Sequence, residues 1–93
     1  MESLRSASVA KVIRALYERG TLYTTEISYE TRVSERHLSV NVLPEMLKDE
    51  IVRSTSEKNK KYYELTDKGK ILALALFDTE NLVDAYRKGN LGT

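Results

Sequence analysis

In the first fifth of the chain, apolar residues recur every three or four positions, which is the spacing of an amphipathic helix. These residues are Val9, Val12, Ile13, Leu16 and Tyr17. Gly20 follows at a place where helices often end in a left-handed residue. The pattern predicts a helix over residues 6–19.

A short β-type piece is predicted over residues 21–23, followed by a second helix that runs to about Thr31. Thr24 or Thr25 is a suitable N-cap, because a hydroxyl oxygen can accept a hydrogen bond from a free N–H group of the first turn. Glu26 then lies where a negative charge suits the helix dipole.

The third predicted helix covers residues 35–49, with Ser34 as its N-cap. Its apolar side consists of Leu38, Val42, Leu43, Met46 and Leu47. The opposite side consists of His37, Asn41, Pro44 and Lys48, with Val40 and Glu45 at its borders. Pro44 conflicts with a regular helix, because it removes a backbone hydrogen bond to Val40 and crowds that carbonyl, at a cost of about 3 kcal/mol. Either the helix bends around the core with Pro44 on its convex side, or it breaks there.

The next stretch has the pattern of a β-hairpin with a polar loop over residues 56–61. In its second strand, the alternation with period 2 puts Tyr63 and Leu65 on a core face, and Tyr62 and Glu64 on a solvent face. The core face of the hairpin is therefore expected to pack against the rest of the protein.

The last predicted helix covers residues 67–88, and Thr66 or Asp67 is its N-cap. Its apolar side chains span roughly 200° of the circumference, whereas a surface helix needs about 100°. They are Ile71, Leu72, Leu74, Ala75, Leu76, Leu82, Val83, Ala85 and Tyr86, and Ala73 and Phe77 lie outside even this arc. The excess predicts cover from a second copy of the chain.

The segment YYELTDKGKIL, residues 62–72, resembles the end of the wing and the start of the following helix in winged helix-turn-helix proteins. The shared pattern is aromatic-x-Leu-Thr-x-x-Gly, and MarR-like, PadR-like and archaeal or archaeal-virus winged-helix regulators have it. The stretch TTEIS…VS…L…LPEML…IV resembles the helix-turn-helix half more loosely. Its turn lacks the Gly often seen there, and Glu50 stands where a Gly is usual.

The resemblance implies an α+β fold that is mostly α, with a three-helix core, a β-hairpin wing and a long C-terminal dimerisation helix. It implies one domain over residues 1–93. The winged-helix core is expected over 6–66 with the wing at about 51–65, followed by the dimerisation helix over 67–88 and a flexible tail over 89–93.

The same resemblance implies that double-stranded DNA is the partner. The third helix would enter the major groove, the wing would touch phosphate or the minor groove, and the start of the second helix would brace the backbone. The implied DNA-binding residues are Thr24, Thr25, Ser34, Arg36, His37, Ser39, Val40, Asn41, Lys48, Arg53, Lys58, Asn59, Lys60 and Lys61. Asparagine is a good bidentate partner for adenine, and lysine neutralises phosphate without reading sequence.

Two alternatives remain open for these residues. If the third helix breaks at Pro44, only Arg36, His37, Ser39 and Val40 are offered to the duplex. The lysines also have an ordinary use, since lysine on an exposed hairpin edge discourages aggregation between strands.

A homodimer through the C-terminal helix would address half-sites about 34 Å apart. The expected interface residues are Ile71, Leu74, Ala75, Asp78, Leu82 and Tyr86.

Composition narrows the class of protein. The chain has 93 residues, 41% of them apolar and 31% charged, so it fits one soluble domain. No apolar run approaches the roughly 20 residues of a membrane span, and the first 19 residues do not resemble a signal peptide, so a cytoplasmic location is expected. With no Cys and a single His, metal sites and Cys–His or Ser–His nucleophile systems have no support, and no cofactor is expected.

Net charge is only +1, which by itself does not indicate nucleic acid. The positive charge is concentrated, however: residues 51–70 carry six basic and three acidic side chains. The expected function is a DNA-binding transcription regulator and not an enzyme, with no small-molecule ligand evident. The alternatives are an architectural DNA-coating protein of the same fold and a winged-helix adaptor that binds proteins, which Glu35 and Glu45 on the exposed side would suit.

Overall fold

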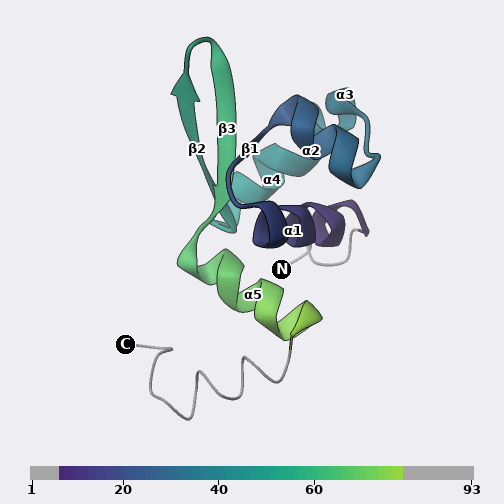
Figure 1. The fold of residues 1–93 in the computed structure, drawn as a ribbon, viewed down its shortest axis with the longest axis vertical. Helices are drawn as coiled ribbons and strands as arrows, with labels where there is room; N and C mark the ends of the chain where they lie inside the picture. The colour runs from purple at the N-terminus through teal and green to yellow at the C-terminus, as the bar shows by residue number, and fades with distance from the viewer. Residues whose placement is uncertain (1–6, 79–93) are drawn as a thin grey trace.

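A computed structural model describes residues 7–78 of the chain. Its elements, in order, are α1 (Ala7–Arg19), β1 (Leu22–Tyr23), α2 (Thr24–Thr31), α3 (Glu35–His37), the π-helical turn η2 (Leu38–Val42), α4 (Leu43–Lys48), β2 (Val52–Glu57), β3 (Lys60–Leu65) and α5 (Asp67–Phe77). The predicted class, α+β and mostly helical, is confirmed. The hairpin β2–β3 projects from a body of helices, and α5 lies at the opposite end of the molecule (Figure 1).

The core forms where the apolar sides of the helices meet the inner face of the sheet. α1 buries four of the residues that its periodicity predicts, Val9, Val12, Ile13 and Leu16, whereas Tyr17 is 39% exposed. The other fully buried large side chains are Ile27, Leu38, Leu43, Met46 and Ile51. The apolar spacing along the chain thus predicted the core correctly.

The sheet has three antiparallel strands in the order β1–β3–β2. β1 pairs Leu22 with Tyr63 and Tyr23 with Tyr62, which confirms the predicted short strand. Tyr63 and Leu65 are buried, as the alternation of β3 predicts.

The hairpin turn is shorter than predicted. β2 and β3 remain paired as far as Glu57 and Lys60, so the loop is only Lys58 and Asn59, with φ of 51° and 66°. Positive φ at both loop residues is the geometry of a type I′ turn, which matches the twist of the strands. The prediction of a loop over 56–61 was wrong because near the tip both faces of the hairpin meet solvent, so strand residues there are polar as well.

The third predicted helix exists, but not as a regular α-helix. α3, η2 and α4 follow one another without a gap over residues 35–48, called the composite helix below. In η2 the N–H of Leu43 bonds to the carbonyl of Leu38, five residues back. Pro44 therefore lies in the first turn of α4, where a missing N–H costs little. The helix does not break at Pro44, because helical residues continue to Lys48, and it widens by one residue in the turn before Pro44.

α2 starts one residue earlier than predicted. Its N-cap is Tyr23, whose backbone N–H donates to the Glu26 carboxylate at 3.1 Å, so the prediction of Thr24 or Thr25 as the cap was wrong. The cause is tertiary: pairing of Tyr23 with β3 holds it extended, and the helix follows at once.

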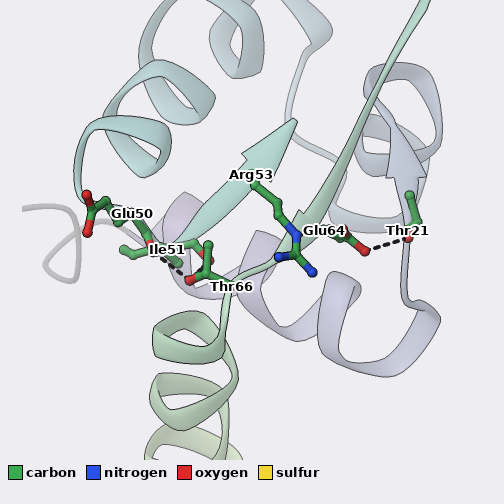
Figure 2. A network of polar contacts seen from close by, with 6 residues as sticks. All are labelled: Thr21, Glu50, Ile51, Arg53, Glu64 and Thr66. Carbon is green, nitrogen blue, oxygen red and sulfur yellow. Dashed lines mark hydrogen bonds and ion pairs between the residues drawn. The ribbon is translucent and has the colours of Figure 1, made fainter. Parts of the chain in front are cut away.

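α5 begins at the predicted N-cap, Thr66, whose hydroxyl accepts from the N–H of Gly69 at 3.0 Å. The same hydroxyl donates to the carbonyls of Glu50 (2.5 Å) and Ile51 (3.1 Å), which ties the helix start to the beginning of the hairpin (Figure 2). A Cβ on Gly69 would overlap the Ile51 carbonyl oxygen, so glycine is required for this close approach. Glu50, which stands where the resembled proteins usually have Gly, adopts a φ of 60°.

The far end of α5 differs from the prediction. The helix ends at Phe77 and Asp78 has a φ of −150°, so the predicted helix does not continue through Asp78. The rest of that prediction, residues 79–88, lies outside the described residues. Asp is a poor residue for a helix interior because its carboxylate competes for nearby backbone N–H groups. Leu82 and Tyr86 of the predicted interface, and the predicted tail over 89–93, lie outside the described residues.

The burial of α5 also differs. Ala73, which was placed outside the apolar arc, is fully buried, while Leu76 and Phe77 are 47% and 39% exposed. Because Gly69 brings α5 close to Ile51, just before β2, the residue four positions later faces the core.

Candidate nucleic-acid interface

The connection between α2 and α3 holds the composite helix in place. Arg32 has a φ of 61°, taking the left-handed conformation that a Gly commonly supplies. The Thr31 hydroxyl donates to the carbonyl of Ile27 and accepts from the N–H of Val33. The Ser28 hydroxyl donates to the Val33 carbonyl at 2.6 Å. These hydrogen bonds between side-chain hydroxyls and backbone groups stabilise the tight turn, which contains no Gly.

The composite helix presents a wide exposed side. Its inward side chains Leu38, Val42, Leu43 and Met46 are buried. Its exposed residues are Glu35, Arg36, His37, Ser39, Val40, Asn41, Pro44 and Lys48. The prediction of the two sides is confirmed, including the exposed position of Pro44.

Two of the predicted DNA-binding residues contact each other. The Asn41 side-chain nitrogen lies 3.1 Å from Nδ1 of His37, one helical turn earlier. The Ser34 hydroxyl accepts from the backbone N–H of His37 at 3.2 Å, as the expected N-cap. Ser34 therefore positions the start of this helix.

The start of α2 faces the start of α3. The Thr25 hydroxyl donates to the Glu35 carboxylate at 2.7 Å, while Thr24 is half-buried. Thr25 thus has an acidic partner within the protein, which orients Glu35 along the protein surface.

The hairpin tip is basic and exposed, with Lys58, Asn59, Lys60 and Lys61. Lys60 Nζ lies 4.3 Å from the centre of the Tyr23 ring, and Lys61 Nζ lies 5.9 Å from that of Tyr63. Cation–π contacts of this kind hold the ammonium groups against rings of β1 and β3 while leaving them charged.

Arg53, predicted at the base of the hairpin, is paired with a carboxylate. Its Nε donates to Glu64 across the strand pair at 2.6 Å, and the Thr21 hydroxyl donates to the same carboxylate at 3.3 Å (Figure 2). The hydrogen bond and charge of Arg53 hold the pKa of Glu64 below its ordinary value of 4.5, and Lys70 adds to the effect. Because Glu64 neutralises Arg53, the positive charge of the hairpin is concentrated at its tip.

The overall arrangement was compared with known proteins. No family model matches the sequence, and no curated protein matches it. Solved structures do match. BpsR of Bordetella bronchiseptica, whose DNA binding is regulated by 6-hydroxynicotinic acid, has 15% identity and a TM-score of 0.75 over 98% of this chain and 64% of its own.

Two further matches have similar values. MepR, a transcription regulator of the Staphylococcus aureus multidrug efflux pump MepA, has 16% identity and a TM-score of 0.72 over 94% of this chain and 66% of its own. The MarR family transcriptional regulator SPO1453 from Silicibacter pomeroyi DSS-3 has 15% identity and a TM-score of 0.70 over 92% of this chain and 62% of its own. This chain therefore spans less than two thirds of the length of each.

At such identities the likeness establishes the fold. The chain is a winged helix-turn-helix. In this fold the β2–β3 hairpin is the wing, and the composite helix follows α1 and α2 along the chain and precedes the wing. The resemblance carried by residues 62–72 is thereby confirmed at the level of the fold.

The structure gathers part of the predicted DNA-binding set of this winged helix and separates the rest. Arg36, His37, Ser39, Val40, Asn41 and Lys48 share the exposed side of the composite helix, and the wing tip forms a second group. Thr25, Ser34 and Arg53 have partners inside the protein. Sequence reasoning missed the His37–Asn41 contact, although their spacing of four residues in a helix is a signal for it.

The last turn of α5 in this winged helix exposes apolar side chains, whereas its first turn exposes charged ones. Ala75, Leu76 and Phe77 are exposed, and Arg14 of α1 lies over the Phe77 ring at 5.6 Å. Of the predicted interface residues, Leu74 lines a hollow together with Leu16 and Leu65 of the same subunit. No helix within residues 7–78 combines the length and apolar character needed to cross a bilayer.

Proposed function

We propose that this winged helix is a homodimeric, sequence-specific DNA-binding transcription regulator. The composite helix enters the major groove, the wing tip contacts phosphate, and the α5 region joins the two copies. The role is binding and not catalysis, on DNA in the cytoplasm. The observation that carries the proposal is the composite helix, which is anchored by buried apolar residues and exposes a polar and basic side.

The dimensions support this docking. A helix with its side chains is about 10–12 Å across, close to the width of the major groove of B-DNA. The wing tip and α3 lie toward the same end of the molecule, and α5 lies toward the other (Figure 1). A dimer through α5 therefore leaves both reading helices and both wings free for one duplex.

The three similar structures support a regulator as well, since BpsR, MepR and SPO1453 are described as proteins that bind DNA or regulate transcription. An isolated positive charge on a loop would not distinguish this role from a solvated surface. Three lysines on a rigid two-residue turn and the strand ends beside it, next to a helix with an exposed polar side, favour contact with a duplex.

The test is selection of duplexes from a random library with the purified protein, followed by affinity measurements over a range of salt. We expect a preferred sequence with two half-sites about one helical turn apart. Changing His37, Asn41 and Lys48 together to Ala should abolish the preference and leave weak general binding.

Changing Lys58, Lys60 and Lys61 to Ala should weaken binding to all duplexes. The slope of log affinity against log salt should become shallower by about 0.9 for each phosphate that the lysines no longer neutralise. Lys11→Ala, an exposed lysine on α1, is the matched control and should change neither quantity. Equal affinity for every duplex would instead identify an architectural protein, and no binding at low salt an adaptor.

The dimer is tested separately by light scattering during gel filtration. Leu76→Glu combined with Phe77→Glu should yield a monomer, because both apolar side chains are exposed in a single copy. Tyr29→Glu is the control, since Tyr29 is 84% exposed on α2 and should leave the mass unchanged.

A further inference from the structure

We propose that His37, Val40 and Asn41 form a preassembled reader of A·T pairs: Asn41 contacts adenine, Val40 packs on the methyl of a neighbouring thymine, and His37 is a positioning residue for Asn41. The inference rests on the proposed function and names the sequence that this site recognises. Two observations support it: the contact between the side chains of His37 and Asn41, and the exposure of the Val40 side chain.

The 3.1 Å contact determines which atoms of Asn41 face outward. Its amide nitrogen is only a donor, so in this contact Nδ1 of His37 accepts, which it does in the tautomer that carries its proton on Nε2. Asn41 keeps its oxygen as a free acceptor and one N–H as a free donor. Adenine offers the complementary pair in the major groove, its N6 amino group and N7.

The same orientation disfavours guanine. Guanine presents two acceptors, O6 and N7, so the outward oxygen of Asn41 would face another acceptor. Because the bond to His37 opposes rotation of the amide by 180°, Asn41 is not free to change its donor and acceptor positions. Selectivity therefore depends on His37 even if its ring touches no base.

Val40 supplies a different kind of contact. It is 59% exposed, and within the composite helix it is the one large apolar residue on the exposed side. Thymine alone among the four bases of DNA carries a methyl group in the major groove. Burying a methyl group contributes about 0.8 kcal/mol, or roughly a fourfold change in affinity.

The π-helical turn brings these residues together. Ser39, Val40 and Asn41 are three consecutive exposed residues, held between buried Leu38 and Val42. Nearby carboxylates are kept away from this centre or held by a partner: Glu45 is half-buried one turn later, and Glu35 is bonded to Thr25. Widened turns of this type are frequent at functional sites.

The experiment measures affinity for the selected duplex and for copies in which single atoms are changed. At the critical adenine, replacement of the A·T pair by G·C should weaken wild-type binding by about tenfold, and 7-deazaadenine should also weaken it, because each removes a contact of the bidentate pair. Replacing the neighbouring thymine by uracil, which removes only the methyl group, should weaken it about fourfold.

Each variant should lose the response of its affinity to one of these base changes. Asn41→Ala should be indifferent to 7-deazaadenine, and Val40→Ala should be indifferent to uracil. His37→Ala should lose most of the A·T over G·C discrimination while keeping the sensitivity to uracil, and His37→Gln, whose amide oxygen can accept from Asn41, should restore the discrimination. All of these positions are exposed, so the thermal midpoints should match wild type, which separates reading from folding.

The results distinguish this inference from the proposed function. Suppose that selection enriches a preferred sequence, but that 7-deazaadenine weakens binding by Asn41→Ala as much as binding by wild type. This result would overturn the inference and leave the proposed function as a regulator standing. Loss of discrimination in His37→Ala without rescue by His37→Gln overturns the positioning role. A selection that enriches no sequence overturns both proposals.

Discussion

The junction between the hairpin and α5 differs from the exposed side of the composite helix in how strongly the fold restricts which residue type can occupy each position. At the junction, Leu65 is buried, Thr66 makes bonds to three backbone groups, and Gly69 has no room for a side chain. On the exposed side, the side chains of His37, Val40 and Asn41 meet solvent, and His37 and Asn41 bond to each other.

This comparison explains why the two regions carry different information. A motif such as aromatic-x-Leu-Thr-x-x-Gly is shared because the geometry of the junction demands those residues, so it identifies the fold. The fold constrains the exposed side less, so under the proposed function its residues can be adapted to one DNA sequence. Substitutions in the first region should change stability, and substitutions in the second should change binding.

The largest effect is expected for Gly69→Ala. The new Cβ would overlap the Ile51 carbonyl oxygen, so α5 must move away from the hairpin. Alanine gains about 1 kcal/mol in helix propensity, but overpacking costs about 1–3 kcal/mol and the Thr66 bonds are strained as well, so we expect a net loss of about 2 kcal/mol. Urea unfolding at fixed protein concentration measures it. Lys70→Ala, exposed on the same turn, is the control, and equal stability of Gly69→Ala and wild type would contradict the close approach.

A smaller loss is expected for Thr66→Ala. The substitution removes the cap of α5 and the bonds to Glu50 and Ile51, which should lower the free energy of unfolding by about 1–2 kcal/mol. Thr66→Ser keeps the hydroxyl and should recover most of the stability. Similar losses for the two variants would show that the methyl group, and not the hydroxyl, stabilises the junction.

Pro44→Ala should change DNA binding while leaving stability nearly unchanged. Alanine restores an N–H that can bond to Val40, so the π-helical turn can become a regular α-helical turn. We expect the free energy of unfolding to change by less than about 1 kcal/mol, because the residue is exposed. The affinity for the preferred duplex should fall nonetheless, since His37, Val40 and Asn41 would rotate relative to Lys48. An unchanged preference would show that the turn does not matter for reading.

The smallest effect is expected for the Arg53–Glu64 pair, which lies at the protein surface. Because pairing lowers the pKa of Glu64 in the folded state, the pair stabilises the fold at pH values above 4.5, and this contribution is lost as the pH falls through the lowered pKa. Glu64→Gln should therefore be slightly less stable than wild type at pH 7, and the difference should disappear in acid. Unfolding curves at several pH values test this, and a difference that grows toward low pH would contradict it.

Sequence reasoning predicted well where structure depends on neighbours along the chain. The spacing of Val9, Val12, Ile13 and Leu16 located α1, and the alternation of Tyr63 and Leu65 located the inner face of β3. It failed where the outcome depended on contacts between distant segments, as at the cap of α2 and the buried position of Ala73. The partners of polar side chains were the hardest to predict. Nothing near Arg53 in the sequence identifies Glu64 as its partner, and nothing near Thr25 identifies Glu35.

By itself the sequence determined the class of fold, the inward and outward sides of its helices, and the helix start at Thr66, because periodicity and capping are local properties of the backbone. The tertiary structure alone decided that Tyr23 caps α2, that Glu64 pairs with Arg53, and that α5 turns Leu76 and Phe77 outward. Each of these depends on where separate segments come to lie, since packing and hydrogen bonding depend on distances in space that residue order does not specify.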